Sequence, residues 1–420
     1  MILVAVLALG VLALTWFGFR SLRRKRLIEN VPTSKVKGVF LGLNEVKGEV
    51  ECDRPLRAHL SSRHCVYYRY EIQEHWSRTE TYRDSKGKTQ TRTSSGWRTV
   101  EDDTVGTAFT LRDDTGGLRV DPAGAEIHAP EVFSETCGRS DPLYYGKGPS
   151  HSVSDSTHRR RFTETALPLG DRVYVLGSAR LRDDVVEPEI THDRSAEIYL
   201  ISTRPESRIA SGYGWGAFFQ LFFAALFVFA GSVLLTAPGS RDLGQAIERG
   251  LPLALPLLAL FGGMVVIYYL VLVYNGLVSV RERAEMALSM IDIQLRRRHD
   301  LVPRLVACVQ GHANYERLTQ ERVAGLRGGD DTGSLKSLFA LVEDYPELKA
   351  DENFAHLQAQ LVDCEDRVSL AREFYNETVT ALRNRLQTLP DSLLKGFGRF
   401  KKLDYLSAAK YERTAPRLDL

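Results

Sequence analysis

Three apolar stretches, each close to the length that crosses a lipid bilayer, constrain this chain more than any other feature. They run from Ile2 to Phe19, from Trp215 to Thr236 and from Leu253 to Tyr274. A helix needs about 20 apolar residues to cross the hydrocarbon core. The first stretch has no basic residue before it and no small-residue cleavage site, so it is interpreted as an uncleaved anchor. The chain is therefore predicted to be a polytopic membrane protein.

These stretches divide the chain into successive segments. We expect a first span at 1–19, a basic juxtamembrane segment at 20–30, a β-rich domain at 31–205, a second span at 215–236, a short external loop at 237–250, a third span at 251–274, a helical domain at 275–410 and a tail at 411–420. The expected fold class is an α+β membrane protein.

The distribution of basic residues predicts the orientation of the spans. Basic residues follow the first span, precede the second and follow the third: Arg20, Arg23, Arg24, Lys25, Arg26, Arg204, Arg208, Arg281 and Arg283. Lys and Arg are enriched in cytoplasmic loops. We therefore expect an inner (plasma) membrane protein with its N-terminus outside and both large soluble parts in the cytoplasm.

Composition excludes several classes of protein. The chain has 55 basic and 53 acidic residues, a formal charge of +2, which gives no indication of nucleic-acid binding. Its five cysteines form no CxxC pair, which argues against a disulfide framework or a RING-type zinc module. No phosphate loop, GxSxG elbow or HExxH motif is present, so neither catalytic residues nor a cofactor are predicted.

Residues 31–205 have the short alternating apolar runs of a β-rich domain, either a small barrel or a sandwich. Within it, the polar segment 77–98 is predicted to be a long hairpin, and 138–157 a loop. Recognition often depends on such loops. Cys52, His59, His64 and Cys65 have the atom types of a zinc site, but side chains of neighbouring strand residues point to opposite faces. We expect no metal, and a buried Cys65.

A family resemblance covers roughly residues 27–205. The stretches GLNEVKGEVECDRPLRAHLSSRHCVYYRYEIQEHW and ETALPLGDRVYVLGSAR resemble the GIDE domain of mitochondrial membrane-anchored RING ubiquitin ligases, which also lies between two membrane spans. In those ligases a C-terminal RING module carries out transfer. Because this chain continues into a helical region instead, the resemblance does not imply ligase activity.

After the third span a charged helical run continues without a Gly/Pro linker, and it has one apolar face. The face comprises Leu277, Ala284, Leu288, Ile291, Leu295, Val302, Leu305 and Val309. A matching three-four alternation recurs at Phe354, Leu357, Leu361, Cys364, Val368, Ala371, Tyr375, Thr378, Leu382, Arg385 and Leu389. These patterns predict a long antiparallel helical hairpin with coiled-coil packing.

A charged cluster in the first helix has candidate partners in the second. Arg296, Arg297, Arg298 and Asp300 face a run that contains Glu365, Asp366 and Glu373. Pairing within the hairpin or between subunits is one interpretation. A solvated basic face that contributes little energy is the other.

A second resemblance covers about residues 270–410. Tyr274-Asn275, the run IDIQLRRRHDLVP and the later segments YPELKA, AREFYN and LPDSLLKGFGRFKK resemble the LemA family. That resemblance implies a membrane helix that continues into an antiparallel helical cytoplasmic domain, with no established enzymatic activity. Leu288 departs from the family's usual tryptophan.

A basic amphipathic segment follows the second helix and is a candidate for contact with the membrane surface. It comprises Leu393, Lys395, Phe397, Arg399, Phe400, Lys401 and Lys402. Packing against the hairpin base or a neighbouring subunit is the alternative.

Together these patterns favour a non-enzymatic membrane scaffold that self-assembles through its spans and hairpins and that organises or remodels the bilayer. The expected partners are the lipid bilayer and further copies of the chain, and nucleic acid is not among them. The alternative is an adaptor or sensor that holds a membrane protease or an envelope-stress protein. An enzyme that uses the β domain is the least favoured class.

Overall fold

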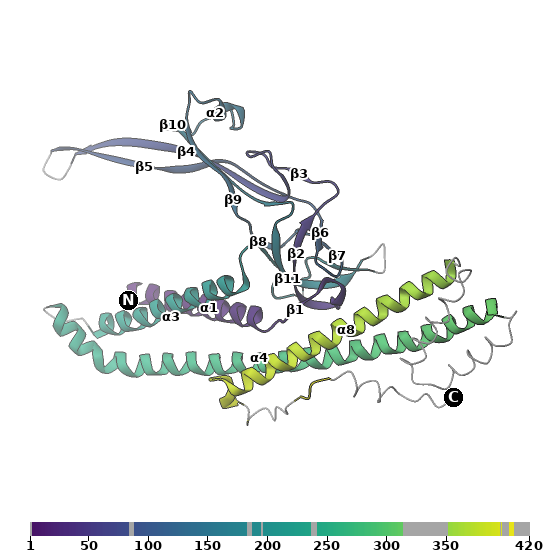
Figure 1. Cartoon of the computed structure of the whole chain (residues 1–420). Helices are drawn as coiled ribbons and strands as arrows, with labels where there is room; N and C mark the ends of the chain where they lie inside the picture. Colours follow the sequence, from purple (N-terminus) through teal and green to yellow (C-terminus); the bar gives the residue numbers. More distant parts are fainter. Residues whose placement is uncertain are drawn as a thin grey trace. The chain divides into compact units, whose positions relative to one another are not determined.

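The computed structural model describes residues 2–83, 88–182, 187–194, 196–236, 242–313, 352–394, 396 and 403–406, with side chains between 306 and 313 left aside. The chain divides into two compact units, Met1–Tyr268 and Tyr269–Leu420. The described strands all belong to the first unit (Figure 1).

Five strands of the first unit close into a small barrel. They are β2 (Gly42–Glu51), β6 (Phe109–Arg112), β7 (Gly117–Val120), β11 (Arg172–Leu181) and β12 (Pro188–Ile190). Around the ring the order is β2-β6-β7-β12-β11 and back to β2, and only the β7–β12 contact is parallel. This is the Greek-key order of the OB-type barrel. The barrel that the sequence predicted is confirmed, and the sandwich alternative is not.

The alternation of side chains along these strands fills the barrel interior. Val46, Val50, Leu111, Val120 and Val175 are each at most 1% exposed and belong to one cluster. Burial of such a side chain contributes about 1.5–3 kcal/mol relative to leaving it exposed.

The second sheet consists of segments inserted between barrel strands. Its strands are β3 (Leu56–Arg57), β4 (His64–Arg83), β5 (Thr89–Gly106), β9 (Glu131–Gly138) and β10 (Ser156–Pro168). The first three lie in the chain between β2 and β6, and the last two between β7 and β11. β4 pairs with β10 and with β5, and β10 pairs with β9. The predicted hairpin at 77–98 is confirmed, because β4 and β5 pair from Tyr67↔Gly106 to Arg83↔Thr89.

Short elements complete the β domain. They are β1 (Thr33–Ser34), a 3-10 turn η1 (Val36–Gly38), β8 (Glu126–His128), the helix α2 (Pro142–Gly146) and β13 (Leu200–Ser202). β1 pairs with β2, β13 with β11 and β8 with β13. α2 lies in the segment 138–157 that the sequence predicted to be a loop, so that prediction was incomplete.

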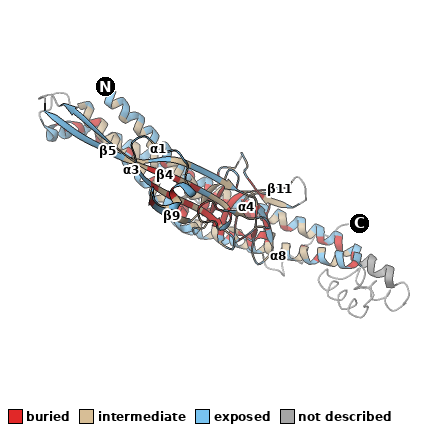
Figure 2. Cartoon of the chain, turned by 90° about the horizontal axis from the view of Figure 1, so that it is seen from above, coloured by how far each residue is buried: buried red, intermediate tan, exposed pale blue. Residues whose placement is uncertain are grey.

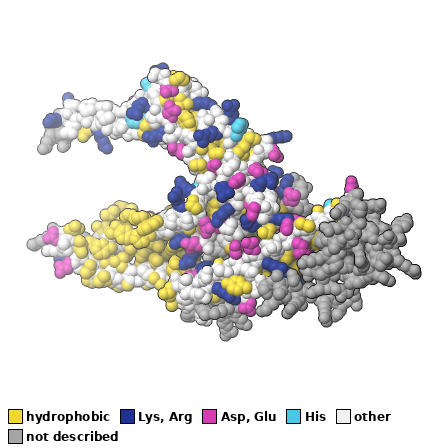
Figure 3. All heavy atoms as spheres, viewed as in Figure 1, with side chains coloured by type: hydrophobic (Ala, Val, Ile, Leu, Met, Phe, Trp, Pro, Cys, Tyr) yellow, Lys and Arg dark blue, Asp and Glu magenta, His cyan; other side chains and the backbone are white. Residues whose placement is uncertain are grey.

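Three helices are long and apolar enough to cross a membrane: α1 (Ile2–Glu29), α3 (Glu206–Thr236) and the first part of α4 (Leu243–Ala313). Figure 3 shows hydrophobic side chains gathered over this part of the first unit. α1 continues through the expected juxtamembrane segment 20–30, and α4 begins inside the expected loop 237–250.

α1 and α3 pack antiparallel, and a glycine allows their close approach. A Cβ atom on Gly18 would lie 2.9 Å from the Leu221 side chain. Three residues along α1, the Ser21 hydroxyl donates to Gln220 at 3.1 Å. Small residues at such positions let membrane helices approach each other closely. We call this helix pair the stem.

The second unit contains the rest of α4, α8 (Glu352–Gln387) and η2 (Asp391–Leu394). Leu277 and Val280 of α4 cluster with Leu382 and Leu386 of α8. Farther along α4, the Cys364 thiol contacts the Gln294 carbonyl at 3.0 Å. The contacts have the order of an antiparallel pair. The connection between the helices lies outside the described residues, so the closed hairpin stays a prediction.

The predicted apolar faces of α4 and α8 agree with the observed burial, with a few differences. The buried members are Leu277, Ala284, Ile291, Leu305, Phe354, Leu361, Cys364, Val368, Ala371, Tyr375, Thr378 and Leu382. Leu288, Leu295, Val302, Leu357 and Arg385 are half-buried. Leu389 is 76% exposed because α8 has already ended at Gln387, and Leu386 is buried instead. The side chain of Val309 lies outside the described set.

Candidate functional site

The barrel is seated on the stem by an apolar cluster. Ile28 at the end of α1 and Ile209 and Ala210 at the start of α3 pack with Tyr174, Leu176, Ile198 and Leu200 of the β domain. Ile28, Leu176 and Leu200 have no exposed surface. The contact joins the membrane helices and the barrel into one packed body.

Basic residues of α1 strengthen this junction. Arg24 donates to Glu126 of β8 at 2.9 Å, and the Tyr213 hydroxyl of α3 donates to the same carboxylate at 2.9 Å. Arg23 pairs with Glu197. Both arginines were expected to orient the first span in the membrane, and in the structure they also contact the β domain.

The other members of the juxtamembrane set lie nearby. Lys25 pairs with Glu29 one helical turn away at 3.7 Å. Arg26 is half-buried and Arg20 is exposed.

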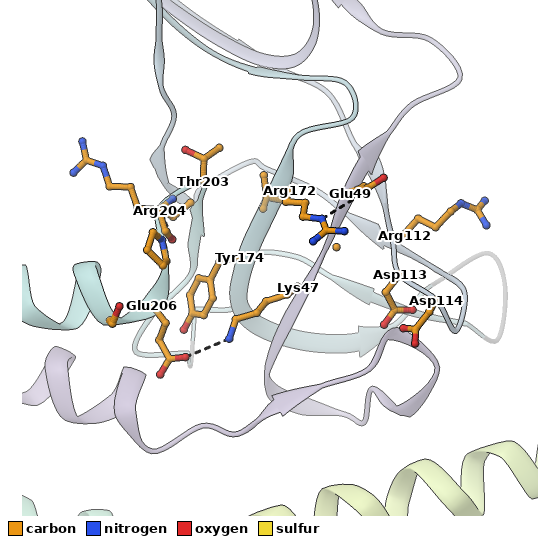
Figure 4. Close-up of a pocket in the computed structure, with 15 residues that line it drawn as sticks. Lys47, Glu49, Arg112, Asp113, Asp114, Arg172, Tyr174, Thr203, Arg204 and Glu206 are labelled. Atoms are coloured by element: carbon orange, nitrogen blue, oxygen red, sulfur yellow. Dashed lines mark hydrogen bonds and ion pairs between the residues drawn. The ribbon is translucent and has the colours of Figure 1, made fainter.

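An open groove of about 900 Å³ lies beside this junction (Figure 4). β2, the β6–β7 turn, the start of β11 and the segment from β13 into α3 provide its walls. Gly48 forms part of the lining, and a side chain is not tolerated there because its Cβ atom would lie 2.5 Å from the carbonyl oxygen of Arg112. The groove is therefore built where two barrel strands approach too closely for a side chain.

A buried carboxylate organises one end of the groove. Glu45 is fully buried and accepts hydrogen bonds from Thr33 and from the Tyr174 hydroxyl, the latter at 3.1 Å. Lys47 lies 2.9 Å from Glu45 and 3.3 Å from Glu206. In Figure 4 the Lys47 and Tyr174 side chains point toward Glu206, in the first turn of α3. One lysine thus links β2 to the start of a membrane helix.

The pKa values of this end reflect its burial. Desolvation raises the pKa of Glu45 above its ordinary value despite the bonds from Thr33 and Lys47. Burial likewise raises the pKa of Tyr174, and the nearby Glu45 and Glu206 carboxylates add to the effect. Burial alone would lower the pKa of Lys47, but its hydrogen bonds to the Glu45 and Glu206 carboxylates and their negative charges together outweigh this and raise it. Lys47 therefore stays a cation at neutral pH.

The rest of the groove displays exposed charges of both signs. Arg172 pairs with Glu49 at 3.3 Å, and Arg112 pairs with Glu51 at 2.6 Å. Asp114 at the rim binds Lys35 at 2.6 Å, and that bond lowers its pKa. The lining contains neither histidine nor cysteine. The arrangement is suited to binding a polar or charged group through ion pairs and hydrogen bonds.

A buried ion pair in the second sheet organises the segment 138–157. Arg160 and Glu74 are both fully buried, with 3.1 Å between Nη2 and the carboxylate. Arg160 also donates to the carbonyl oxygens of Tyr144 at 2.8 Å, Pro149 at 2.7 Å and His151 at 2.6 Å. Its guanidinium lies 4.0 Å from the centre of the Tyr144 ring. One side chain thus holds the polypeptide around α2 against β4 and β10.

The four residues considered for zinc make separate contacts. Cys65 is buried, and desolvation together with Glu164 raises its pKa to about 11. Cys52 contacts the Ala108 carbonyl, and the His59 ring stacks on Tyr70 at 4.4 Å. His64 is exposed at the start of β4. Over the described part of the chain, no three His, Cys, Asp or Glu residues form a group that could hold a metal ion.

The charged residues of α4 and α8 that were predicted to interact differ in burial and in the contacts that they make. Arg298 is 6% exposed and lies 2.7 Å from Glu365, and Arg297 lies 3.9 Å from Asp363. Arg296, Asp300, Asp366 and Glu373 are exposed. The structure therefore brings Arg298 and Glu365 together within one chain.

Most of the membrane-surface candidate lies beyond the described residues. Leu393 is 62% exposed in η2. Lys395, Phe397, Arg399, Phe400, Lys401 and Lys402 are not described.

Three of the residues that organise these sites were not predicted from the sequence: Glu45, Glu74 and Arg160. Glu45 lies on the face of β2 opposite to the core residues Val46 and Val50, so the alternation gives no signal for its burial. Glu74 shares a face of β4 with Ile72, and Arg160 shares a face of β10 with Phe162, and a charge on such a core face is a detectable signal. The identity of its partner is not, because Glu74 and Arg160 are 86 residues apart.

Comparisons with known proteins match both regions of the chain. The LemA family model matches residues 287–420, and the GIDE model, described as E3 ubiquitin ligase, matches residues 77–235. The chain is 23% identical over 202 residues to magnetosome proteins MamQ 1 and MamQ 2 of Paramagnetospirillum magneticum, covering 38% of this chain and 74% of each relative. It is 25% identical over 173 residues to MamQ of Magnetospirillum gryphiswaldense, covering 31% of this chain and 64% of the relative.

Each matched region corresponds to one of the two resemblances that the sequence motifs carried. The barrel, the second sheet and α3 fall largely within the GIDE match, and α8 falls within the LemA match. The chain thus joins a GIDE-like β domain to a LemA-like helical region.

Proposed function

We propose that this protein is a non-enzymatic membrane scaffold that self-assembles and displays its β domain as a recognition surface. The observation that best supports this proposal is the junction of the barrel with the stem. An apolar cluster and the Arg24–Glu126 pair fix the β domain to two membrane-length helices. A domain held in this way has a defined position relative to the bilayer, as a scaffold requires.

The length of α4 supports the same proposal. Its 71 residues extend on the order of 100 Å at about 1.5 Å per residue. The hydrocarbon core is only about 30 Å thick. Much of α4 therefore lies outside the bilayer, where its contacts with α8 provide the start of a rigid helical pair. The similarity to magnetosome proteins agrees with a membrane-associated role.

Self-assembly through the spans and the helical pair is tested by co-capture from native membranes. Two differently tagged full-length copies are co-expressed, extracted with their surrounding lipid, and one tag is captured. The proposal expects the second tag in the captured fraction at a stoichiometric level. Recovery of one tag alone, with both copies present in the membrane, would contradict self-assembly.

For localisation, we propose the inner membrane with the N-terminus outside and both soluble parts in the cytoplasm. The basic residues next to the spans support this orientation. A reporter inserted at Gly244 is expected to behave as external. Cytoplasmic behaviour at that position would overturn the orientation.

The groove supports a second candidate, an adaptor that holds a protein partner such as a membrane protease or an envelope-stress protein. Its charges of both signs form an open surface beside the stem. Capture after crosslinking distinguishes the two functions, because an adaptor retains a stoichiometric second protein. Arg172→Ala is expected to reduce that recovery, and Arg180→Ala on the far part of the same strand is the matched control.

A further inference from the structure

The distal part of the β4–β5 hairpin projects from the second sheet without a core of its own. β4 makes its last pairing with β10 at Trp76, and beyond it β4 and β5 continue as a two-stranded ribbon from Ser77↔Ser95 to Arg83↔Thr89. Seven residue pairs extend about 23 Å at 3.3 Å per residue. We call residues 77–83 and 88–98 the arm. In Figure 2 the outer part of β4 and β5 is exposed.

The charge of the arm is opposite to that of the rest of the chain. The arm contains five basic residues and one acidic residue, a net charge of +4, whereas the whole chain carries +2. The remainder is therefore slightly acidic. The described basic residues of the arm are Arg78, Arg83, Lys88, Arg92 and Arg98, and each is exposed or half-exposed. Concentrated positive charge on a projecting ribbon is suited to an anionic partner.

Hydroxyl groups accompany these charges. Eight of the 18 residues in the arm are serine or threonine, and only Tyr82 and Trp97 are large and apolar. Hydroxyls and guanidinium groups both donate hydrogen bonds to phosphate oxygens. Tyr82 is 49% exposed, and an amphipathic ring of this kind is favoured at a membrane–water interface. The arm thus offers hydrogen-bond donors for phosphate oxygens together with one aromatic residue suited to the membrane–water interface.

The base of the arm is rigid. Arg98 lies over the Trp76 ring at 6.0 Å, and Arg161 of β10 lies over the Trp97 ring at 4.3 Å. Glu74 of the buried Glu74–Arg160 pair lies two residues before Trp76 in β4, and Arg160 lies in β10. Because the ribbon is fixed at its base, its basic residues are held together and can contact one partner surface at the same time.

We propose that the arm binds the phosphate headgroups of an anionic lipid surface. A chain with three membrane-length helices is held at high local concentration beside such a surface. Each basic residue near an anionic membrane strengthens binding about fivefold. The arm therefore gives the β domain a second, electrostatic contact with lipid.

The test uses the full chain in nanodiscs of phosphatidylcholine, which leave the arm without an anionic surface. Vesicles of phosphatidylcholine with or without half phosphatidylglycerol are offered, and capture is measured at low and high salt. We expect capture of the anionic vesicles alone, weakened by salt. The variant R78Q/R83Q/K88Q/R92Q should lose capture by about 600-fold.

Two controls make the outcome specific. R54Q/R57Q/R119Q/R180Q removes four exposed arginines of the β domain that belong neither to the arm nor to the groove, and should retain capture within about threefold. R78K/R83K/R92K retains the charge of the arm and should retain most capture, which separates lost charge from misfolding.

Equal capture by the arm variant and the unaltered chain would overturn the proposal. It would also be overturned if polyglutamate or a short DNA duplex bound the arm more tightly than the anionic vesicles, because the partner would then be an acidic protein or a nucleic acid. Co-capture of two tagged copies is measured separately, so failure here leaves the scaffold proposal intact.

Discussion

Replacement of Arg160 by methionine is the perturbation with the largest effect that the structure predicts. The change removes the partner of a fully buried Glu74 and three hydrogen bonds to main-chain carbonyls of the segment 144–151. Methionine retains much of the apolar volume, so the lost interactions are chiefly polar. Removing one member of a buried ion pair typically costs about 3–5 kcal/mol.

That cost is large relative to the stability of the domain. Folded domains are stable by about 5–15 kcal/mol, and a change of 1 kcal/mol shifts the melting temperature of a domain of this size by about 2–4 °C. We expect R160M to lower the melting temperature of the β domain by about 10 °C. The neighbouring exposed residue provides the matched control, R159M, with an expected shift under about 2 °C.

Thermal unfolding of the full chain in nanodiscs, followed by tryptophan fluorescence, measures this effect. Trp76 and Trp97 lie at the base of the arm, close to the altered site. Because Arg160 also fixes β4 where the arm begins, R160M should weaken capture of anionic vesicles as well. Equal melting temperatures for R160M and R159M would refute the role assigned to the buried pair.

Three further predictions concern the same unit. Glu74→Gln should reduce the loss of stability at acid pH. Burial alone would raise the pKa of Glu74, but bonds from Ser156, Tyr144 and Arg160 lower it. The ionised carboxylate therefore contributes fully to stability above about pH 4.5, and this contribution is lost as the pH falls below that value. Gly18→Leu should reduce disulfide crosslinking between cysteines placed at Ser21 and Gln220, whereas Gly216→Leu, which meets open space, should not. Arg24→Glu should increase proteolysis at the start of α3 by weakening the Glu126 contact, and the added change Glu126→Arg should restore protection.

Much of the architecture followed from local pattern. The three spans, the barrel, the 77–98 hairpin and most buried positions of α8 depend on runs and periods of apolar residues, which are properties of neighbouring positions. The end of α8 was placed too late because Leu389 continues the alternation although Pro390 follows it. The period of the apolar residues does not reveal that a proline disfavours the helical conformation of the residue before it.

The sites were harder to predict because they depend on contacts between distant segments. Glu45, Tyr174 and Glu206 come from two strands and a helix, and only the closure of the barrel brings them together. Arg23 and Arg24 are recognisable in the sequence as basic residues that follow a span. Their partners Glu197 and Glu126 lie in the β domain, far away in the chain. Local reading thus identified the charges, and the fold determined their partners.

If the chain assembles with itself in the membrane, each extracted particle contains more than one subunit. Single-particle mass measurement of the full chain, extracted with its native lipid, gives the number of subunits once the mass of the lipid is subtracted. We expect a discrete protein mass of two or more times the 47.2 kDa subunit. A protein mass of one subunit, unchanged as the amount of protein in the membrane rises, would rule out self-assembly.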